Sequence, residues 1–136
     1  MRDSPWAPTR IAVVDDDDAV RRAFKRLLQV AGLQVEAFAS GGEFLLALAP
    51  GRFDCVLLDM NMPELTGLEV LKRMHASGIH VPAVVATAYD DEGMREQCLA
   101  WGARAFLRKP TGREQLLEAI AQAVAPVRQD RRGGTL

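Results

Sequence analysis

The feature that most constrains this chain is a strict alternation between short apolar runs and amphipathic segments, repeated five times between residues 11 and 124. The runs at 54–58 and 81–86 are almost continuously apolar, which is typical of strands covered on both faces of a parallel sheet. The segments between the runs carry apolar residues at helical spacing, as Val20, Phe24 and Leu27 do. This alternation over short connections predicts an α/β domain with helices on both faces of its sheet.

The predicted fold is a flavodoxin-like, doubly wound five-stranded parallel sheet with five helices and strand order 2-1-3-4-5. Gly32, Pro50-Gly51 and Gly102 mark helix ends. The expected strands are 11–14, 33–38, 54–58, 81–86 and 103–107, and the expected helices are 19–31, 40–48, 65–74, 90–101 and 114–124.

Composition limits the classes of protein that fit this pattern. A chain of 136 residues with 49% apolar side chains can build one core, so we expect a domain at 9–125, an N-terminal extension at 1–8 and a flexible tail at 126–136. The formal charge of −1 provides no overall field toward nucleic acid or an anionic membrane. Two cysteines are too few for a disulfide framework or a zinc site, and no apolar run approaches the roughly 20 residues of a membrane span. We therefore expect a cytoplasmic protein with reduced thiols.

Polar side chains follow four of the predicted strands. Ligands of doubly wound sheets lie outside the carboxyl ends of the strands, where the winding changes direction. The residues at these ends are Asp15, Asp16, Asp59, Thr87 and Lys109. Crowded carboxylates repel one another unless a hard cation is bound, and oxygen ligands with open coordination positions indicate Mg²⁺ and phosphoryl chemistry. We expect Lys109 to pair with the same phosphoryl group.

Each of these residues also has a simpler interpretation. Asp17 and Asp18 are best explained as the cap of the following helix, because acidic residues favour helix N-termini. The two acids before them exceed what one cap requires, and both interpretations stay open for them. Asp59 could be a solvated loop residue, Thr87 an ordinary strand residue and Lys109 an exposed lysine in a turn. The site prediction therefore rests on the coincidence of four strand ends.

Four motifs in this order resemble the receiver domains of two-component response regulators, over about residues 9–125. The motifs are Val13-Val14-Asp15-Asp16, Leu57-Leu58-Asp59-Met60-Asn61-Met62-Pro63 with Gly67, Ala86-Thr87-Ala88, and Lys109-Pro110. The resemblance implies a phosphorylation-dependent signalling switch of a phosphorelay. Such a domain is a phosphoacceptor that catalyses its own phosphorylation and slow dephosphorylation, and it is not a turnover enzyme.

The resemblance also implies a nucleophile and a metal site. Asp59 would attack a phosphohistidine or a small acyl phosphate and become an aspartyl phosphate. Asp16 would bind Mg²⁺ directly and Asp15 through a water molecule, together with Asp59 and the backbone carbonyl of Asn61. The Asn61 side chain, two residues after the nucleophile, would tune the access of water to the phosphoryl group.

A second group of residues would respond to the phosphoryl group. Thr87 and Lys109 would contact its oxygens, and Pro110 is the candidate for a cis proline after the lysine. Phe106 would move inward when Thr87 is drawn to the phosphate, although a core-packing role is its alternative. The bulky Tyr89 would screen the phosphoryl group from water. The surface expected to change comprises the fourth helix, the fifth strand and the fifth helix.

The expected partners follow from the same resemblance. They are a histidine kinase or a histidine phosphotransfer protein, and a downstream protein target or a fused output domain outside this chain. A phosphorylation-dependent dimer is a further option, and direct binding to membranes or nucleic acid is not expected. A stand-alone receiver, a regulator with a DNA-binding domain and a hybrid kinase all remain open.

Other functions fit the residues less well. Mg²⁺-dependent phosphohydrolases carry a second acid two residues after the nucleophile, where this chain has Asn61. A flavin phosphate would be repelled by the four aspartates after the first strand. A glycine-rich Walker-type loop for nucleotide hydrolysis does not occur in the sequence.

Overall fold

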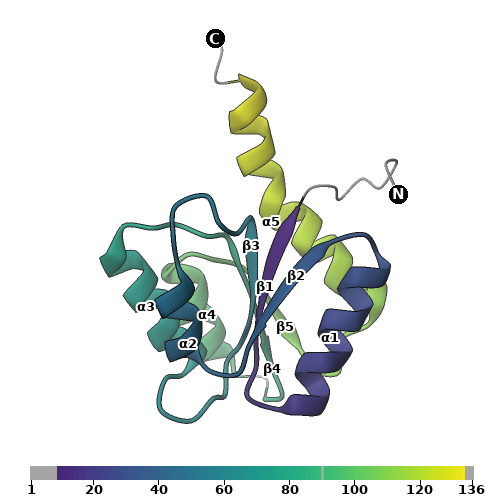
Figure 1. Ribbon diagram of the computed structural model, residues 1–136. Coiled ribbons are helices and arrows are strands. Elements are labelled where there is room, and N and C mark those ends of the chain that lie inside the picture. Colours follow the sequence, from purple (N-terminus) through teal and green to yellow (C-terminus); the bar gives the residue numbers. More distant parts are fainter. Residues whose placement is uncertain (1–8, 90, 134–136) are drawn as a thin grey trace.

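The computed structural model describes the backbone of residues 9–89 and 91–133, with side chains as far as Ala125. In this part of the chain a single sheet of five parallel strands, in the order β2-β1-β3-β4-β5, is flanked by five helices, which confirms the predicted flavodoxin-like fold (Figure 1). The strands are β1 (Arg10–Val14), β2 (Gln34–Phe38), β3 (Cys55–Asp59), β4 (Ala83–Thr87) and β5 (Ala103–Arg108). The helices are α1 (Asp18–Val30), α2 (Gly41–Ala47), α3 (Gly67–Ser77), α4 (Glu92–Ala100) and α5 (Arg113–Gly133).

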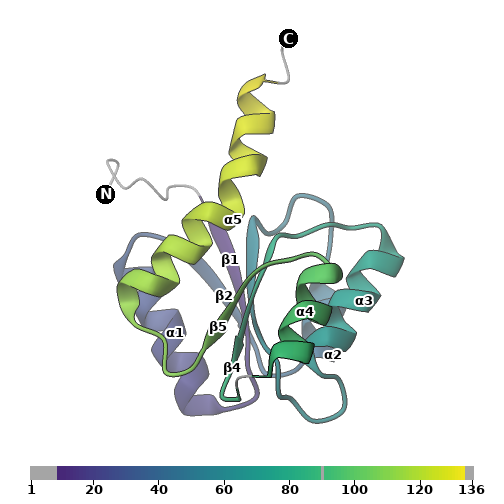
Figure 2. The same cartoon turned by 180° about the vertical axis from the view of Figure 1, so that it is seen from behind.

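The sheet is covered on both faces, as Figures 1 and 2 show: α1 and α5 lie on one side, and α2, α3 and α4 on the other. Alternate residues of β1 belong to two separate cores. Ile11 and Val13 pack with residues of α1 and α5, whereas Ala12 and Val14 pack with residues of α2, α3 and α4. Because side chains alternate across a strand, a strand buried on both faces needs apolar residues at every position.

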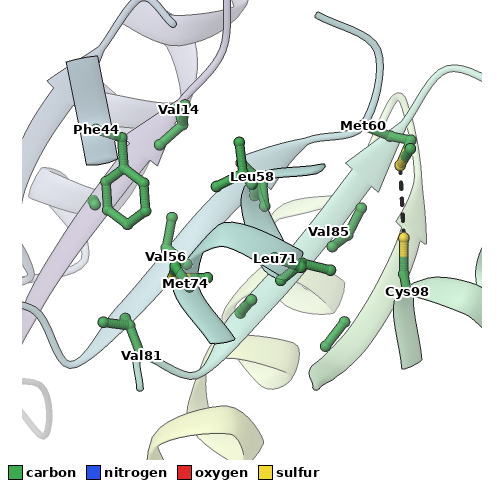
Figure 3. Packing of buried hydrophobic residues seen from close by; sticks show 14 of the residues in the cluster. Val14, Phe44, Val56, Leu58, Met60, Leu71, Met74, Val81, Val85 and Cys98 are labelled. Atoms are coloured by element: carbon green, nitrogen blue, oxygen red, sulfur yellow. Dashed lines mark hydrogen bonds between the residues drawn. The ribbon is translucent and has the colours of Figure 1, made fainter. Parts of the chain in front are cut away.

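Figure 3 shows part of the core beneath α2, α3 and α4. Phe44 of α2 and Leu71 of α3 pack with Val56 and Leu58 of β3 and are almost fully buried. Cys98 of α4 lies in the same core, with its Sγ 3.6 Å from Sδ of Met60. Burial raises the pKa of the Cys98 thiol to about 11, so it stays protonated at neutral pH.

Strand register brings the strand ends to one level. Val14 of β1 pairs with Leu58 of β3, and Asp59 pairs with Ala86 of β4. Thr87 in turn pairs with Arg108 of β5, directly before Lys109. The winding changes direction between β1 and β3, because β2 lies on the far side of β1. The acidic residues after these two strands therefore flank the crevice where ligands of such sheets bind.

Most element ends lie within two residues of the predicted ones, except the C-terminal ends of α3 and α5. Helix α3 begins at Gly67, two residues after the predicted start at 65, and ends at Ser77, three residues beyond the predicted end at 74. A capping box sets its start: Thr66 Oγ1 accepts the Glu69 backbone N–H at 3.2 Å, and the Thr66 N–H donates to Glu69 Oε1 at 2.8 Å. The Thr-x-x-Glu pattern was legible in the sequence, and the prediction did not use it.

The predicted end of the last helix is wrong. Helix α5 continues through Pro126 to Gly133, nine residues beyond the predicted end at Val124, and extends away from the sheet (Figure 1). Proline removes one helical hydrogen bond, but its fixed φ is itself helical, so a proline does not always end a helix. The flexibility predicted for 126–136 stays a prediction, and 1–8 and 134–136 lie outside the described residues. Among the described residues no helix is long and apolar enough to cross a membrane, and this includes α5.

Glu64, in the loop between β3 and α3, has a left-handed backbone with φ of 70°. The Leu65 N–H donates to the Pro63 carbonyl oxygen at 2.8 Å across it, which closes a tight γ-turn. A side chain is disfavoured at this φ, so Glu64→Gly should raise the free energy of unfolding by about 1 kcal/mol. Urea denaturation measures the change. Glu64→Ala is the matched control, because it removes the carboxylate but keeps Cβ, and an equal gain in that variant would contradict a backbone cause.

Candidate functional site

Two buried carboxylates form the centre of the site. Asp15 follows β1 and Asp59 ends β3, and their side chains are 2% and 5% exposed. Asp16 lies beside them but faces solvent. One carboxylate oxygen from each of the three residues lies within 4.8 Å of the others. The structure therefore brings together the three acids that the sequence proposed as metal ligands.

Lys109 joins the two buried acids from the end of β5. Its Nζ donates to Asp15 Oδ2 at 2.8 Å and to Asp59 Oδ1 at 3.0 Å. Its backbone N–H donates to the Thr87 carbonyl oxygen at 2.7 Å, which fixes the start of the loop against β4. The Lys109–Pro110 peptide bond is cis.

Burial and the hydrogen bonds of Lys109 shift the pKa values of Asp59 and Lys109 in opposite directions. Burial raises the pKa of Asp59 to about 6; the hydrogen bond from Lys109 opposes the shift and the charge of Asp15 adds to it. Burial alone would lower the pKa of Lys109, but its hydrogen bonds to Asp15 and Asp59 raise it overall. The lysine therefore stays cationic at neutral pH, between two carboxylates.

The raised pKa of Asp59 predicts a pH dependence of metal binding. In the metal-free protein this carboxyl should titrate near pH 6, well above its usual 3.8. A metal ion must displace the proton, so Mg²⁺ affinity should fall by up to about tenfold for each pH unit below 6, and stay nearly constant above 7. Calorimetric titrations with Mg²⁺ between pH 4.5 and 8 measure the affinity, and ¹³C-carboxyl NMR of Asp59 measures its pKa. Affinity that is unchanged down to pH 5 would contradict the raised pKa.

Thr87 and Asn61 form a second cluster beside the acids. Thr87 Oγ1 donates to Asn61 Oδ1 at 2.7 Å and accepts the backbone N–H of Tyr89 at 3.1 Å. The backbone N–H of Asn61 points to Asp59 Oδ1 at 3.4 Å. The Tyr89 side chain is 71% exposed. The sequence identified all of these residues but did not predict the contact between the two side chains.

Phe106 lies apart from the strand ends, in the core beneath α4. It is 7% exposed, and the Arg95 guanidinium carbon lies 5.5 Å from its ring centre. The ring is thus already buried in this structure. An inward movement of Phe106 stays a prediction.

The residues after Asp15 show which acids cap the helix. Asp17 Oδ1 accepts the Val20 N–H at 3.0 Å and is the N-cap of α1. Asp18 forms an ion pair with Arg21. Arg21 Nη1 also donates to the Asp15 carbonyl oxygen at 2.8 Å, a contact the sequence did not predict. The capping role expected for Asp17 agrees with this geometry. Asp15 and Asp16 belong to the acidic group at the strand ends.

Gly67 allows α3 to start directly against the site. A Cβ at this position would lie 2.7 Å from the Asp59 carbonyl oxygen and 3.0 Å from Met60 Cα. Both atoms are backbone and cannot rotate away, so Gly67→Ala should lower the free energy of unfolding by about 1–3 kcal/mol. Thermal and urea denaturation measure the change.

Gly42→Ala is the matched control for this prediction. Gly42 lies in the first turn of α2, and a Cβ there would meet Ser40 Oγ at 3.9 Å, an ordinary contact. Alanine should stabilise that helix by about 0.5–1 kcal/mol. Equal effects of the two substitutions would contradict the steric role of Gly67.

The donor set fits a hard divalent cation. The acidic group offers oxygen ligands from Asp15, Asp16 and Asp59, and Mg²⁺ prefers such ligands while keeping several water molecules. Lys109 supplies one positive charge against three carboxylates, so the cluster retains negative charge that a cation would neutralise. The Asn61 backbone carbonyl follows Asp59 in the same loop and could add a fourth oxygen.

Several known proteins are similar to this chain in sequence. The sequence model of the family described as "Response regulator receiver domain" matches residues 11–121. The response regulator MprA of Mycolicibacterium vanbaalenii is 44% identical over 110 residues, which cover 81% of this chain and 48% of that protein. The transcriptional regulatory protein FixJ of Azorhizobium caulinodans is 36% identical over 110 residues, which cover 81% and 52%. The chain thus spans about half the length of these relatives.

Solved structures agree with the sequence relatives. A structure of the response regulator StyR superposes with a TM-score of 0.84 at 36% identity, covering 95% of this chain and 67% of that one. A CheY-like receiver domain from Methanospirillum hungatei superposes with a TM-score of 0.81 at 30% identity, covering 92% and 98%. The similarity to the second structure extends over nearly its whole length.

Proposed function

The chain belongs to the response regulator receiver domain family, whose members are phosphorylation-dependent signalling domains of two-component systems, and on that premise we propose that Asp59 is its phosphoacceptor. The observation that carries the proposal is the triad at the strand ends, in which one lysine joins two buried carboxylates. A site of this kind holds a carboxylate in a fixed place, next to positive charge that can stabilise an incoming phosphoryl group.

The reaction forms an acyl phosphate on Asp59. One carboxylate oxygen attacks phosphorus of a phosphohistidine, the P–N bond breaks, and the imidazole leaves as the free histidine. The contacts from Lys109 and Asn61 both reach Oδ1, so we take Oδ2 as the attacking oxygen. Lys109 then moves its hydrogen bonds to a phosphoryl oxygen, while Thr87 donates to another.

Three acids, Asp15, Asp16 and Asp59, with the Asn61 carbonyl, would hold Mg²⁺. When bound, the ion supplies positive charge that offsets the repulsion between phosphate and carboxylates. The protein's own contribution is to hold the carboxylates together: Asp15 through Lys109 and the Asp17 N–H, which donates to Asp15 Oδ1 at 2.9 Å.

Signalling partners complete the proposal. A histidine kinase or a histidine phosphotransfer protein would supply the phosphoryl group, and a protein contact over α4, β5 and α5 would change in response. Because the chain spans about half of its relatives, the output could be a fused domain, a separate target or a dimer contact. A cytoplasmic location and slow self-dephosphorylation, tuned by Asn61 and Tyr89, belong to the same proposal.

The test is the intact mass after incubation with acetyl phosphate, with Mg²⁺ and with excess EDTA. A gain of one phosphoryl group that requires Mg²⁺ is expected. No gain under either condition, from acetyl phosphate or from a phosphorylated histidine donor, would contradict the proposed function and leave an unphosphorylated interaction domain as the alternative.

A further inference from the structure

We propose that the Asn61 side chain is a latch that holds the Thr87 hydroxyl in the unphosphorylated protein and so sets the threshold of the switch. Asn61 is here a positioning residue, because its side chain acts through Thr87. The inference rests on the proposed function, since it concerns the phosphoryl contact assigned to Thr87.

The latch is a single short, partly buried hydrogen bond between a buried hydroxyl and an exposed amide side chain. Thr87 is 1% exposed, and its Oγ1 donates to Asn61 Oδ1 at 2.7 Å. The same oxygen accepts the Tyr89 N–H at 3.1 Å, so the hydroxyl is engaged both as donor and as acceptor. In the resting protein its donor role and one acceptor role are therefore taken by two different partners.

A hydroxyl has one proton to donate. While Thr87 donates this proton in a hydrogen bond to Asn61 Oδ1, it cannot donate it to a phosphoryl oxygen on Asp59. Asn61 is also held next to the nucleophile, because its backbone N–H points to Asp59 Oδ1 at 3.4 Å. One residue thus contacts both the reacting carboxylate and the switch hydroxyl, and the active state must break its contact with Thr87.

The cost of breaking the latch predicts the size of the effect. A neutral hydrogen bond contributes about 1 kcal/mol net, which corresponds to about a fivefold change in an equilibrium. Removing the acceptor should therefore shift the resting protein toward the active state by about fivefold. Asn61 itself is exposed, so its substitution should leave the fold intact.

A double-mutant cycle separates the latch from other roles of Asn61. The probe is beryllofluoride with Mg²⁺, a stable mimic of the phosphoryl group, and its dissociation constant is measured by calorimetry. Asn61→Ala should tighten binding about fivefold in the wild-type background and change it little in a Thr87→Val background, where there is no hydroxyl to hold. An equal tightening in both backgrounds, or none in the wild type, would overturn the latch.

A second measurement needs neither metal nor phosphate. The Thr87 methyl signal is followed by ¹³C NMR in unphosphorylated, metal-free protein. Asn61→Ala should move this signal, whereas Asn61→Asp, which keeps an acceptor oxygen, should leave it near its wild-type position. A signal that moves equally in both variants, or in neither, would overturn the proposal.

The two measurements also distinguish failure of the latch from failure of the proposed function. If the wild-type protein does not bind beryllofluoride, the phosphoacceptor assignment fails, and the NMR comparison still decides whether Asn61 holds Thr87. If it binds beryllofluoride and the cycle shows no coupling, the phosphoacceptor stands and the latch is wrong.

Discussion

An Asp59→Asn variant is expected to gain no phosphoryl group from acetyl phosphate, with labelling reduced by about 100-fold or more. The amide has no anionic oxygen to attack phosphorus. The variant should remain folded, because the folded protein disfavours the ionised form of this carboxyl, as its pKa of about 6 indicates. An acid whose pKa is raised from 3.8 to about 6 on folding loses stability as the pH rises through this range, and asparagine does not carry this cost at pH 7.5. Intact mass and thermal denaturation at pH 7.5 measure both effects.

Asp91→Asn is the matched control for this experiment. Asp91 is the N-cap of α4, and its Oδ1 accepts the Met94 N–H at 3.1 Å. Asparagine caps helices about as well as aspartate, so this variant should label like the wild type. Persistent labelling of Asp59→Asn would move the phosphoacceptor to another residue. Loss of labelling in both variants would point to an indirect cause.

Replacing Lys109 by methionine is expected to slow labelling by acetyl phosphate about 100-fold or more, without abolishing it. Methionine has a similar length but no charge, so the cation beside Asp59 disappears while the nucleophile remains. The variant should also be less stable in EDTA by about 3 kcal/mol, because the carboxylates of Asp15 and Asp59 lose their shared partner. If the acids hold Mg²⁺ as proposed, the ion should restore much of this stability, since a ligand that binds only the folded state stabilises it.

Lys25→Met controls for the loss of a lysine as such. Lys25 lies half-buried on α1, away from the strand ends, and its substitution should change neither the labelling rate nor the dependence of stability on Mg²⁺. A wild-type labelling rate in Lys109→Met would remove this lysine from phosphoryl transfer. A melting temperature that is independent of Mg²⁺ in that variant would contradict the balance of charge argued for the site.

These two variants probe different parts of one electrostatic arrangement. Asp59 carries the proposed attacking oxygen, and Lys109 joins two buried carboxylates. The lysine would also compete with a bound metal ion for the same oxygens. Mg²⁺ binding and the labelling rate should therefore respond in opposite directions to Lys109→Met: tighter binding of the ion and slower transfer.

The strand-helix order and the residues at the strand ends were predictable from sequence. Apolar runs such as 81–86 are typical of strands covered on both faces of a parallel sheet, and the carboxyl ends of parallel strands lie at the same edge. This pattern predicted that Asp15, Asp59, Thr87 and Lys109 lie at one edge of the sheet. It misplaced the C-terminal ends of α3 and α5, because helix ends depend on caps and on local backbone bonds more than on apolar spacing.

Which polar atoms pair inside that edge was decided by tertiary structure. The sequence placed Lys109 near a phosphoryl group, whereas in the structure its Nζ joins Asp15 and Asp59. The sequence treated Asn61 and Thr87 as separate residues, and the structure joins them through a 2.7 Å hydrogen bond. The physical reason is that backbone periodicity determines which residues reach a site, whereas burial, rotamers and competition among several donors and acceptors determine which of them bind each other.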